Sequence, residues 1–144
     1  MKKYLLLFGA FALLFSALAA CGGAGSAAPA GSIPVQITET DFHIASSVTT
    51  FLPGKNYHFV VTNQGKTMHE FMIMPASAGS MNGRSMANMD KAALTSINMI
   101  DPGQTATLDY TFPASAAHAH LEFACHFSGH YEAGMKLDVM VKTA

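Results

Sequence analysis

Short segments of apolar residues, many of them alternating with polar ones, follow one another from about residue 33 to the end of the chain. A side chain on every second position faces the same side of a strand, so strict alternation predicts a half-buried β-strand. Clusters of Gly, Pro and Asn separate the segments and predict turns, as at Pro53-Gly54 and Asp101-Pro102-Gly103. The strands predicted in this way span 35–39 with a continuation through 42 and 44, 57–62, 69–74, 105–112, 120–127 and 136–141.

One segment has a different period. Between Ser85 and Ile100 the apolar residues Met86, Met89, Ala93, Leu94 and Ile97 recur about every three or four positions, which is typical of a one-sided helix. Ser85 is a suitable helix cap. We therefore predict an all-β Greek-key sandwich or barrel with a short helical insertion.

The first twenty residues are typical of an export signal. Lys2 and Lys3 precede an apolar run, which ends in small residues just before Cys21. The segment Leu18-Ala19-Ala20-Cys21 also resembles the bacterial lipobox, in which the cysteine is lipidated and becomes the new N-terminus. We predict a lipoprotein signal at 1–20 and lipidation at Cys21; the alternative is an ordinary signal with an incidental cysteine.

The next stretch contains no charge and no large side chain, so it cannot bury enough surface to order itself. We predict a flexible tether over 21–32 and a single folded domain over 33–144. If Cys21 is lipidated, Cys125 is the only thiol of that domain.

The amino-acid composition excludes several classes of protein and indicates metal binding. Half of the residues are hydrophobic, which excludes a disordered chain, and only 12% are charged, with a formal net charge of −1. A nucleic-acid partner is therefore not expected. Two cysteines exclude a disulfide scaffold. Ten Met and seven His are the unusual counts, and both residue types bind soft or borderline metals.

Three such donors lie close together near the C-terminus: Cys125, His130 and Met135 follow the spacing Cys-x4-His-x4-Met. His69 opens a predicted strand far upstream. One thiolate, two imidazoles and a weak axial thioether are the ligands of a blue-copper centre. The sequence therefore predicts one copper ion, cycling between Cu(I) and Cu(II), held by these four residues.

This pattern resembles the cupredoxins, the type 1 blue-copper family that includes azurin, plastocyanin and rusticyanin. The loop Cys125-His126-Phe127-Ser128-Gly129-His130 is similar to the family's ligand loop, and Thr67-Met68-His69-Glu70-Phe71 to the strand that carries its first histidine. The resemblance covers 33–144 and implies an eight-stranded Greek-key sandwich with copper near one end and His130 close to the surface. Glu70 and Ser128 depart from the family pattern, which affects the tuning of the reduction potential.

Each candidate residue also has an alternative interpretation that does not involve the predicted copper centre. Cys125 and Met135 are also ordinary core residues, and His69 also fits a strand-end histidine. His43 and His58 are expected to be exposed on strands. His118, His120 and His126 are candidates for further copper and are reminiscent of multicopper oxidases, but Ala124 stands where those enzymes place another histidine. The remaining methionines either fill gaps in the core or offer a soft surface for docking or for Cu(I): Met68, Met72, Met74, Met81, Met86, Met89 and Met99.

The resemblance implies an electron carrier, not an enzyme. Its expected partners are redox proteins such as a cytochrome or a terminal oxidase. The predicted signal and anchor place a monomer outside the cytoplasmic membrane, on the periplasmic or extracellular face. A copper chaperone or scavenger that uses the same site and the Met/His-rich surface is the alternative.

Overall fold

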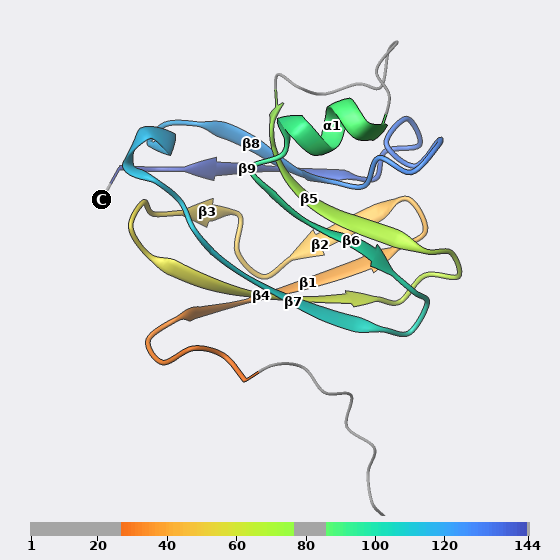
Figure 1. The fold of residues 1–144 in the computed structure, drawn as a ribbon, viewed down its shortest axis with the longest axis horizontal. Helices are drawn as coiled ribbons and strands as arrows, with labels where there is room; N and C mark the ends of the chain where they lie inside the picture. Colours follow the sequence, from red (N-terminus) through yellow and green to blue (C-terminus); the bar gives the residue numbers. More distant parts are fainter. Residues whose placement is uncertain (1–26, 77–85, 144) are drawn as a thin grey trace, which may run out of the picture.

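The computed structural model describes residues 27–76 and 86–143, and its strands form two facing sheets (Figure 1). Several predictions fall outside these residues: the export signal 1–20, lipidation at Cys21, the first part of the tether and the cap Ser85. In the described part, no helix has both the length and the apolar character needed to span a bilayer.

The first sheet has four strands in the order β2-β1-β4-β7. These strands are β1 (Ile33–Thr40), β2 (His43–Ser46), β4 (Asn56–Asn63) and β7 (Thr105–Thr111). β1 runs parallel to β4 and antiparallel to β2, and β4 is antiparallel to β7. The first sheet is therefore mixed, with one parallel pair of strands and two antiparallel pairs.

The second sheet has five strands in the order β3-β9-β8-β5-β6. They are β3 (Thr50–Phe51), β5 (His69–Pro75), β6 (Thr95–Ile100), β8 (His120–Ala124) and β9 (Lys136–Val141). β5 pairs antiparallel with both β6 and β8, and β8 pairs antiparallel with β9. The described residues therefore hold nine strands where the family resemblance implied eight.

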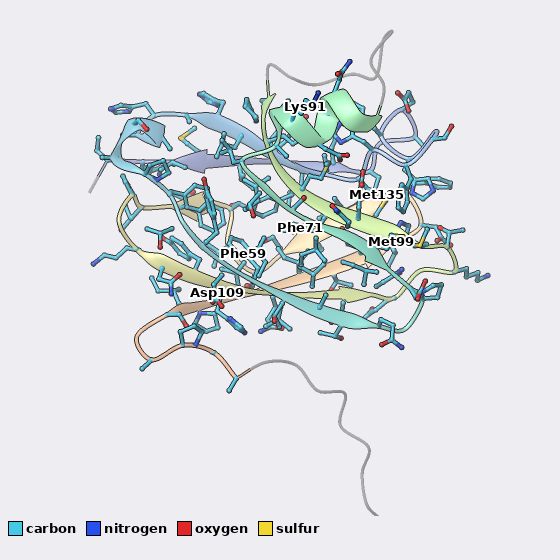
Figure 2. The ribbon with its side chains drawn as sticks, viewed as in Figure 1. Phe59, Phe71, Lys91, Met99, Asp109 and Met135 are labelled. Atoms are coloured by element: carbon cyan, nitrogen blue, oxygen red, sulfur yellow. The ribbon has the colours of Figure 1, made fainter. Side chains whose placement is uncertain are left out.

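Aromatic rings fill the space between the two sheets. Phe59 of β4 packs on Phe71 of β5 and on Phe123 of β8, with ring centroids 5.8 Å apart in both pairs. Phe51 and Phe112 lie 4.9 Å apart at the same level of the core. All five rings are fully buried, and Figure 2 shows Phe59 and Phe71 between the layers. The predicted all-β sandwich is confirmed.

The helical prediction for 85–100 is correct only in its first half. Helix α1 (Met86–Ala92) covers the outer face of β5, where Met89 packs against Met72 and Met74 (Figure 1). Because α1 covers one face of β5 and the core covers the other, β5 is buried on both faces and reads as a continuous apolar run. Residues 95–100 are strand β6: hydrogen bonding to the edge of β5 overrides the helical period, and β-branched Thr and Ile fit a strand.

A second correction concerns the first predicted strand. The pattern over 35–44 indicated one continuous strand, but the chain reverses at Asp41–Phe42 and forms the β1–β2 hairpin, with Thr40 paired to His43. Phe42 has a φ of 66°, in the left-handed region that aromatic residues rarely adopt. The turn was not predicted because Phe42 is apolar and fits the alternating pattern of a strand.

Candidate metal centre

Two neighbouring strands bring His69 and Cys125 to the same edge of the second sheet. His69 is the first residue of β5, and Cys125 directly follows β8. The strands are antiparallel, with Met72 opposite Ala124, so the start of β5 lies beside the end of β8. His130 reaches the same place from the loop between β8 and β9.

The side chains of His69, Cys125 and His130 converge, with their ligand atoms all within 4.8 Å of one another. The Sγ of Cys125 lies 3.4 Å from the Nδ1 of His130, and the Nδ1 of His69 lies 3.3 Å from the same nitrogen. His69 and Cys125 are fully buried and His130 is half-buried. In the described part of the chain, this is the only group of three or more His, Cys, Asp or Glu side chains that meets in this way.

The loop between β8 and β9 is a compact turn that fixes two of the predicted ligands. The amide of His130 donates to the carbonyl of Phe127 at 2.8 Å, and the amide of Met135 donates to the carbonyl of His130 at 3.0 Å. The amide of Cys125 donates to the carbonyl of Met135 at 3.2 Å, which closes the base of the loop. Met135 is fully buried in the same core cluster as Cys125, as expected of an axial ligand and equally of a core methionine.

Cys125 is a free, buried thiol whose surroundings favour a metal over a proton. Burial raises the pKa of the thiol to about 11, although the backbone amides of Glu70 and Phe127 both donate to the sulfur and act in the opposite direction. The thiol is therefore protonated at neutral pH in the metal-free protein. A cation bound at this place would favour the thiolate over the protonated thiol, because a coordinated thiol is deprotonated outright. Two amide donors aimed at the sulfur suit a thiolate.

His69 is held as a neutral imidazole. Burial lowers its pKa most, the neighbouring His130 lowers it further, and Asp41 acts in the opposite direction. Its Nδ1 faces the other two ligand atoms, whereas its buried Nε2 has no hydrogen-bond partner among the described residues. A neutral imidazole with Nδ1 directed at a thiol and a second imidazole is suited to bind a transition metal.

Glu70, the departure from the family pattern next to His69, connects the two ligand-bearing segments. Its Oε1 accepts a hydrogen bond of 2.7 Å from the backbone amide of His126, the residue after Cys125. Burial raises the pKa of this carboxyl group. The ring of His126 is buried and stacks on Tyr131, with centroids 4.6 Å apart. Glu70 therefore ties the start of β5 to the ligand loop.

His58, His118 and His120 lie away from this cluster. His58 was expected to be exposed, but it is buried, and its Nδ1 lies 2.8 Å from the Oδ1 of Asp109 on the neighbouring strand β7. This expectation is wrong because the carboxylate of Asp109 gives the His58 ring a polar partner, which allows the ring to be buried. The alternation of residues along one strand does not reveal such a contact with the neighbouring strand. His43 is exposed as expected. His118 and His120 are also exposed, and they lie before and at the start of β8, at the opposite end of that strand from Cys125.

The methionines fall into two groups. Met72, Met74 and Met89 form a buried cluster beneath α1, which confirms core packing for these three. Met68 and Met99 are 38% and 70% exposed, and they flank the start of β5, where His69 pairs with Ile100. Met81 lies outside the described residues, and so does the side chain of Met86.

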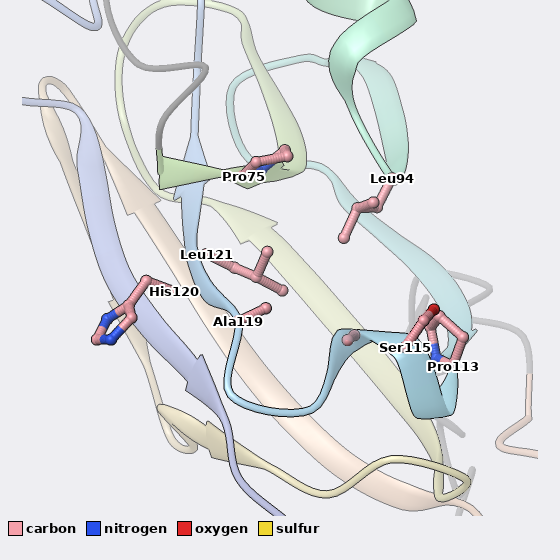
Figure 3. Close-up of a pocket in the computed structure, with 8 residues that line it drawn as sticks. Pro75, Leu94, Pro113, Ser115, Ala119, His120 and Leu121 are labelled. Carbon is pink, nitrogen blue, oxygen red and sulfur yellow. The ribbon is translucent and has the colours of Figure 1, made fainter.

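An apolar pocket of about 270 Å³ lies at the far end of the same sheet (Figure 3). Its walls include Pro75 at the end of β5, Leu94 before β6, and Ala119 and Leu121 around the start of β8. Because β5 runs from His69 to Pro75, this pocket and the cluster of ligand atoms lie at opposite ends of the strand. It adds nothing to the candidate metal centre.

Asn63, the last residue of β4, holds the loop that leads to His69. Its side-chain nitrogen donates to the carbonyls of Thr67 and Ile100, both at 2.8 Å, and its oxygen accepts from the amide of Gly65 at 2.8 Å. Asn63 is fully buried. The predicted strand 57–62 ended one residue before Asn63, and the sequence analysis missed the role of this side chain.

The change Asn63→Ala is expected to lower the free energy of unfolding by about 2 kcal/mol, because it leaves buried backbone groups without partners. Urea denaturation of the metal-free protein measures the effect. The exposed Asn98→Ala on β6 is the control and should change the free energy by less than about 0.5 kcal/mol. Equal values for the two variants would contradict the assigned role.

Comparisons with known proteins agree with this architecture. No protein-family model matches the chain. The copper-resistant cuproprotein CopI of Pseudomonas aeruginosa is 28% identical over 160 residues, which cover 90% of this chain and 87% of that protein. The structure of auracyanin B superposes with a TM-score of 0.58 at 21% identity, covering 81% of this chain and 92% of that one. Auracyanin A, a "blue" copper protein of Chloroflexus aurantiacus, gives 0.56 at 16% identity, covering 78% and 100%. The chain therefore has the cupredoxin-like fold that its sequence indicated.

Proposed function

We propose that the protein is a type 1 (blue) copper protein that carries single electrons between redox partners in the cell envelope. The observation that carries the proposal is the convergence of one thiol and two imidazoles within 4.8 Å. A soft sulfur and two neutral nitrogens are the donors that copper binds in both oxidation states. The cuproprotein relative and the cupredoxin-like fold support the choice of copper. A bound copper ion supplies the one-electron chemistry by cycling between Cu(I) and Cu(II).

His69, Cys125 and His130 would hold the copper, and the thioether of Met135 is proposed as a fourth, weaker donor. Cys125 loses its proton when the metal binds, and the amides of Glu70 and Phe127 then donate to the thiolate. The loop hydrogen bonds and the Glu70–His126 contact hold these groups in place in either oxidation state. A site that barely moves when its charge changes lowers the barrier to electron transfer.

His130 is the proposed route for electrons. It is the half-buried member of the cluster, and the rings of Phe42 and Phe127 pack edge-on against it at 5.5 and 6.0 Å between centroids. Phe42 is 50% exposed, and the exposed Met99 lies at the same end of the sandwich as Met135 (Figure 2). An apolar surface around one exposed ligand suits brief docking of a redox protein, such as a cytochrome or a terminal oxidase.

The chain is proposed to turn over no substrate and to act as a monomer. The export signal and Cys21 lead us to propose a lipid anchor on the outer side of the cytoplasmic membrane, with residues 21–32 as the tether to the folded domain. These proposals rest on the sequence pattern alone.

Copper handling is the second candidate function. The relative is named a copper-resistant cuproprotein, and two exposed thioethers, those of Met68 and Met99, lie at the ligand end. Thioethers bind Cu(I) in preference to harder metals. A chaperone or scavenger gives copper up, whereas an electron carrier keeps it.

Copper titration with voltammetry tests both functions. An electron carrier should take up one Cu(II) with an intense visible band from sulfur-to-copper charge transfer, and it should cycle reversibly at an electrode without losing metal. A copper handler should bind more than one equivalent, or release Cu(I) rapidly to a soluble chelator. A colourless protein with full copper occupancy would contradict a type 1 site.

A further inference from the structure

One two-residue turn contacts both candidate histidine ligands. Asp41 and Phe42 connect β1 to β2, in the first sheet, whereas His69 belongs to the second sheet and His130 to the loop after β8. The Oδ1 of Asp41 lies 3.7 Å from the Nε2 of His69. The ring of Phe42 meets the ring of His130 edge-on, with centroids 5.5 Å apart and planes at 88°. Consecutive residues of a turn therefore face the two imidazoles from outside the cluster.

The carboxylate of Asp41 is itself held in place. Its Oδ1 accepts hydrogen bonds from the amide of Lys66 at 2.9 Å and from the hydroxyl of Thr67 at 3.1 Å. A Cβ added at Gly65 would lie only 2.6 Å from this oxygen and 2.7 Å from the Nε2 of His69. The absence of a side chain at Gly65 thus lets the carboxylate and the imidazole approach each other. Metal-binding histidines commonly direct their second nitrogen at such a carboxylate.

Phe42 occupies its position at a backbone cost. Its φ of 66° is rare for an aromatic residue, and its ring is half exposed, so burial in the core does not explain the choice of residue. Strained backbone of this kind persists where the surrounding structure uses it, often at functional sites. Among the residues that the structure describes, the ring that Phe42 contacts is that of His130.

We propose that the Asp41–Phe42 turn is a clamp that positions both histidine ligands. At 3.7 Å the Oδ1 of Asp41 and the Nε2 of His69 are too far apart for a hydrogen bond, but the negative charge of Asp41 favours the N–H of His69 on Nε2. This tautomer leaves Nδ1 free for the metal, and the same charge favours Cu(II) over Cu(I). Phe42 restricts the ring of His130 and slows its departure from the metal. This inference rests on the proposed copper function, and Asp41 and Phe42 are positioning residues, not ligands.

The isosteric change Asp41→Asn tests the first half. The Cu(II) dissociation constant should rise by about 10–100-fold, the usual effect of losing a partner of a metal-bound histidine. The Cu(I) constant should rise less, so the reduction potential should increase. The control is Asp109→Asn, which removes the carboxylate beside His58 far from Met135 and the ligand end (Figure 2). If both variants match the wild type in affinity and potential, Asp41 does not position His69.

Phe42→Gly tests the second half. Glycine accepts a positive φ without strain, so the backbone turn is preserved while the ring is lost. Copper release to a chelator should be about tenfold faster than in the wild type. The control is His118→Gly, an exposed residue with the same φ of 66° and outside the site. Equal release rates in the two variants would overturn the role of Phe42.

A measurement without copper separates this inference from the copper function. Nitrogen NMR of the metal-free protein, and of the protein with Zn(II), reports which ring nitrogen of His69 carries the proton. The clamp requires the proton on Nε2 in the wild type and a shifted Nε2–H signal in Asp41→Asn. A wild type with this tautomer but no coloured copper complex would refute the copper function alone. A proton on Nδ1 in both forms would refute the clamp alone.

Discussion

Replacement of Cys125 by serine is expected to abolish the intense visible band of the copper-loaded protein. The band requires a sulfur bonded to Cu(II), and the Sγ of Cys125 is the only sulfur of a cysteine in the described residues. A serine hydroxyl has almost the same shape, so the fold should persist, but it does not lose its proton at neutral pH. Copper affinity should fall by more than about 100-fold, beyond the effect of losing a residue that only supports a ligand.

The measurement is absorbance during Cu(II) titration, followed by competition with a chelator. Cys21 is changed to serine in every sample, so that no second thiol contributes. Ser128→Ala, an exposed change in the same loop, is the matched control and should keep both colour and affinity. An intense band in Cys125→Ser would eliminate the assigned ligand set, whatever the copper content.

The second large effect is expected at Glu39, on β1. This side chain is fully buried, and neither carboxyl oxygen has a hydrogen-bond partner among the described residues. Burial, and to a lesser extent the charge of Glu70, raises the pKa of Glu39 from 4.5 to about 8. The folded protein therefore keeps the Glu39 proton at pH values at which the unfolded chain has already released it.

The sign of the pH dependence follows from this difference. Below pH 4.5 both states hold the proton and Glu39 costs nothing in ionisation. Between pH 4.5 and about 8 only the folded state holds it, so the free energy of unfolding falls by about 1.4 kcal/mol per pH unit. At pH 7 the accumulated loss is about 3 kcal/mol. Glu39→Gln keeps the shape of the neutral acid, removes the titration and should recover this stability.

Urea denaturation of metal-free wild type and Glu39→Gln at pH 4.5 and pH 7 checks the prediction. The two proteins should have similar free energies of unfolding at the lower pH and differ by about 3 kcal/mol at the higher one. The exposed change Glu132→Gln controls for the loss of one carboxylate and should show no such difference between pH values. A constant gap between wild type and Glu39→Gln would mean that Glu39 is ionised in the folded protein.

Sequence periodicity was sufficient for most of the fold because each sheet has one face against the core. Ile37 and Phe59 lie inside as their alternating patterns indicated. The spacing of Cys125 and His130 within one loop also made their proximity predictable, since a tight turn leaves few other arrangements. His69 was assigned because it completes the set of donors that a blue-copper centre needs, and the resemblance to a known family supported that assignment. Only the pairing of β5 with β8 shows that it lies beside the other two.

Other features depend on contacts between distant parts of the chain and had no local signal. Phe42 fits the alternating pattern of a strand, and its turn geometry appears only where β2 folds back on β1. Residues 95–100 became a strand because the edge of β5 was available for pairing. Glu39 did have a signal: it continues the alternation of Val35 and Ile37, which places a carboxyl group on the core face.

The antiparallel pairing of β5 with β8 also affects the lifetime of the protein. The cluster draws on positions 69, 125 and 130, so it exists only after β5 has paired with β8 and the loop that follows β8 has formed. A ligand that binds the finished fold and not the extended chain shifts the balance toward the finished fold. Proteases that attack opened chains should therefore degrade the loaded protein more slowly than the empty one, and metal supply would then regulate its abundance without any change in synthesis.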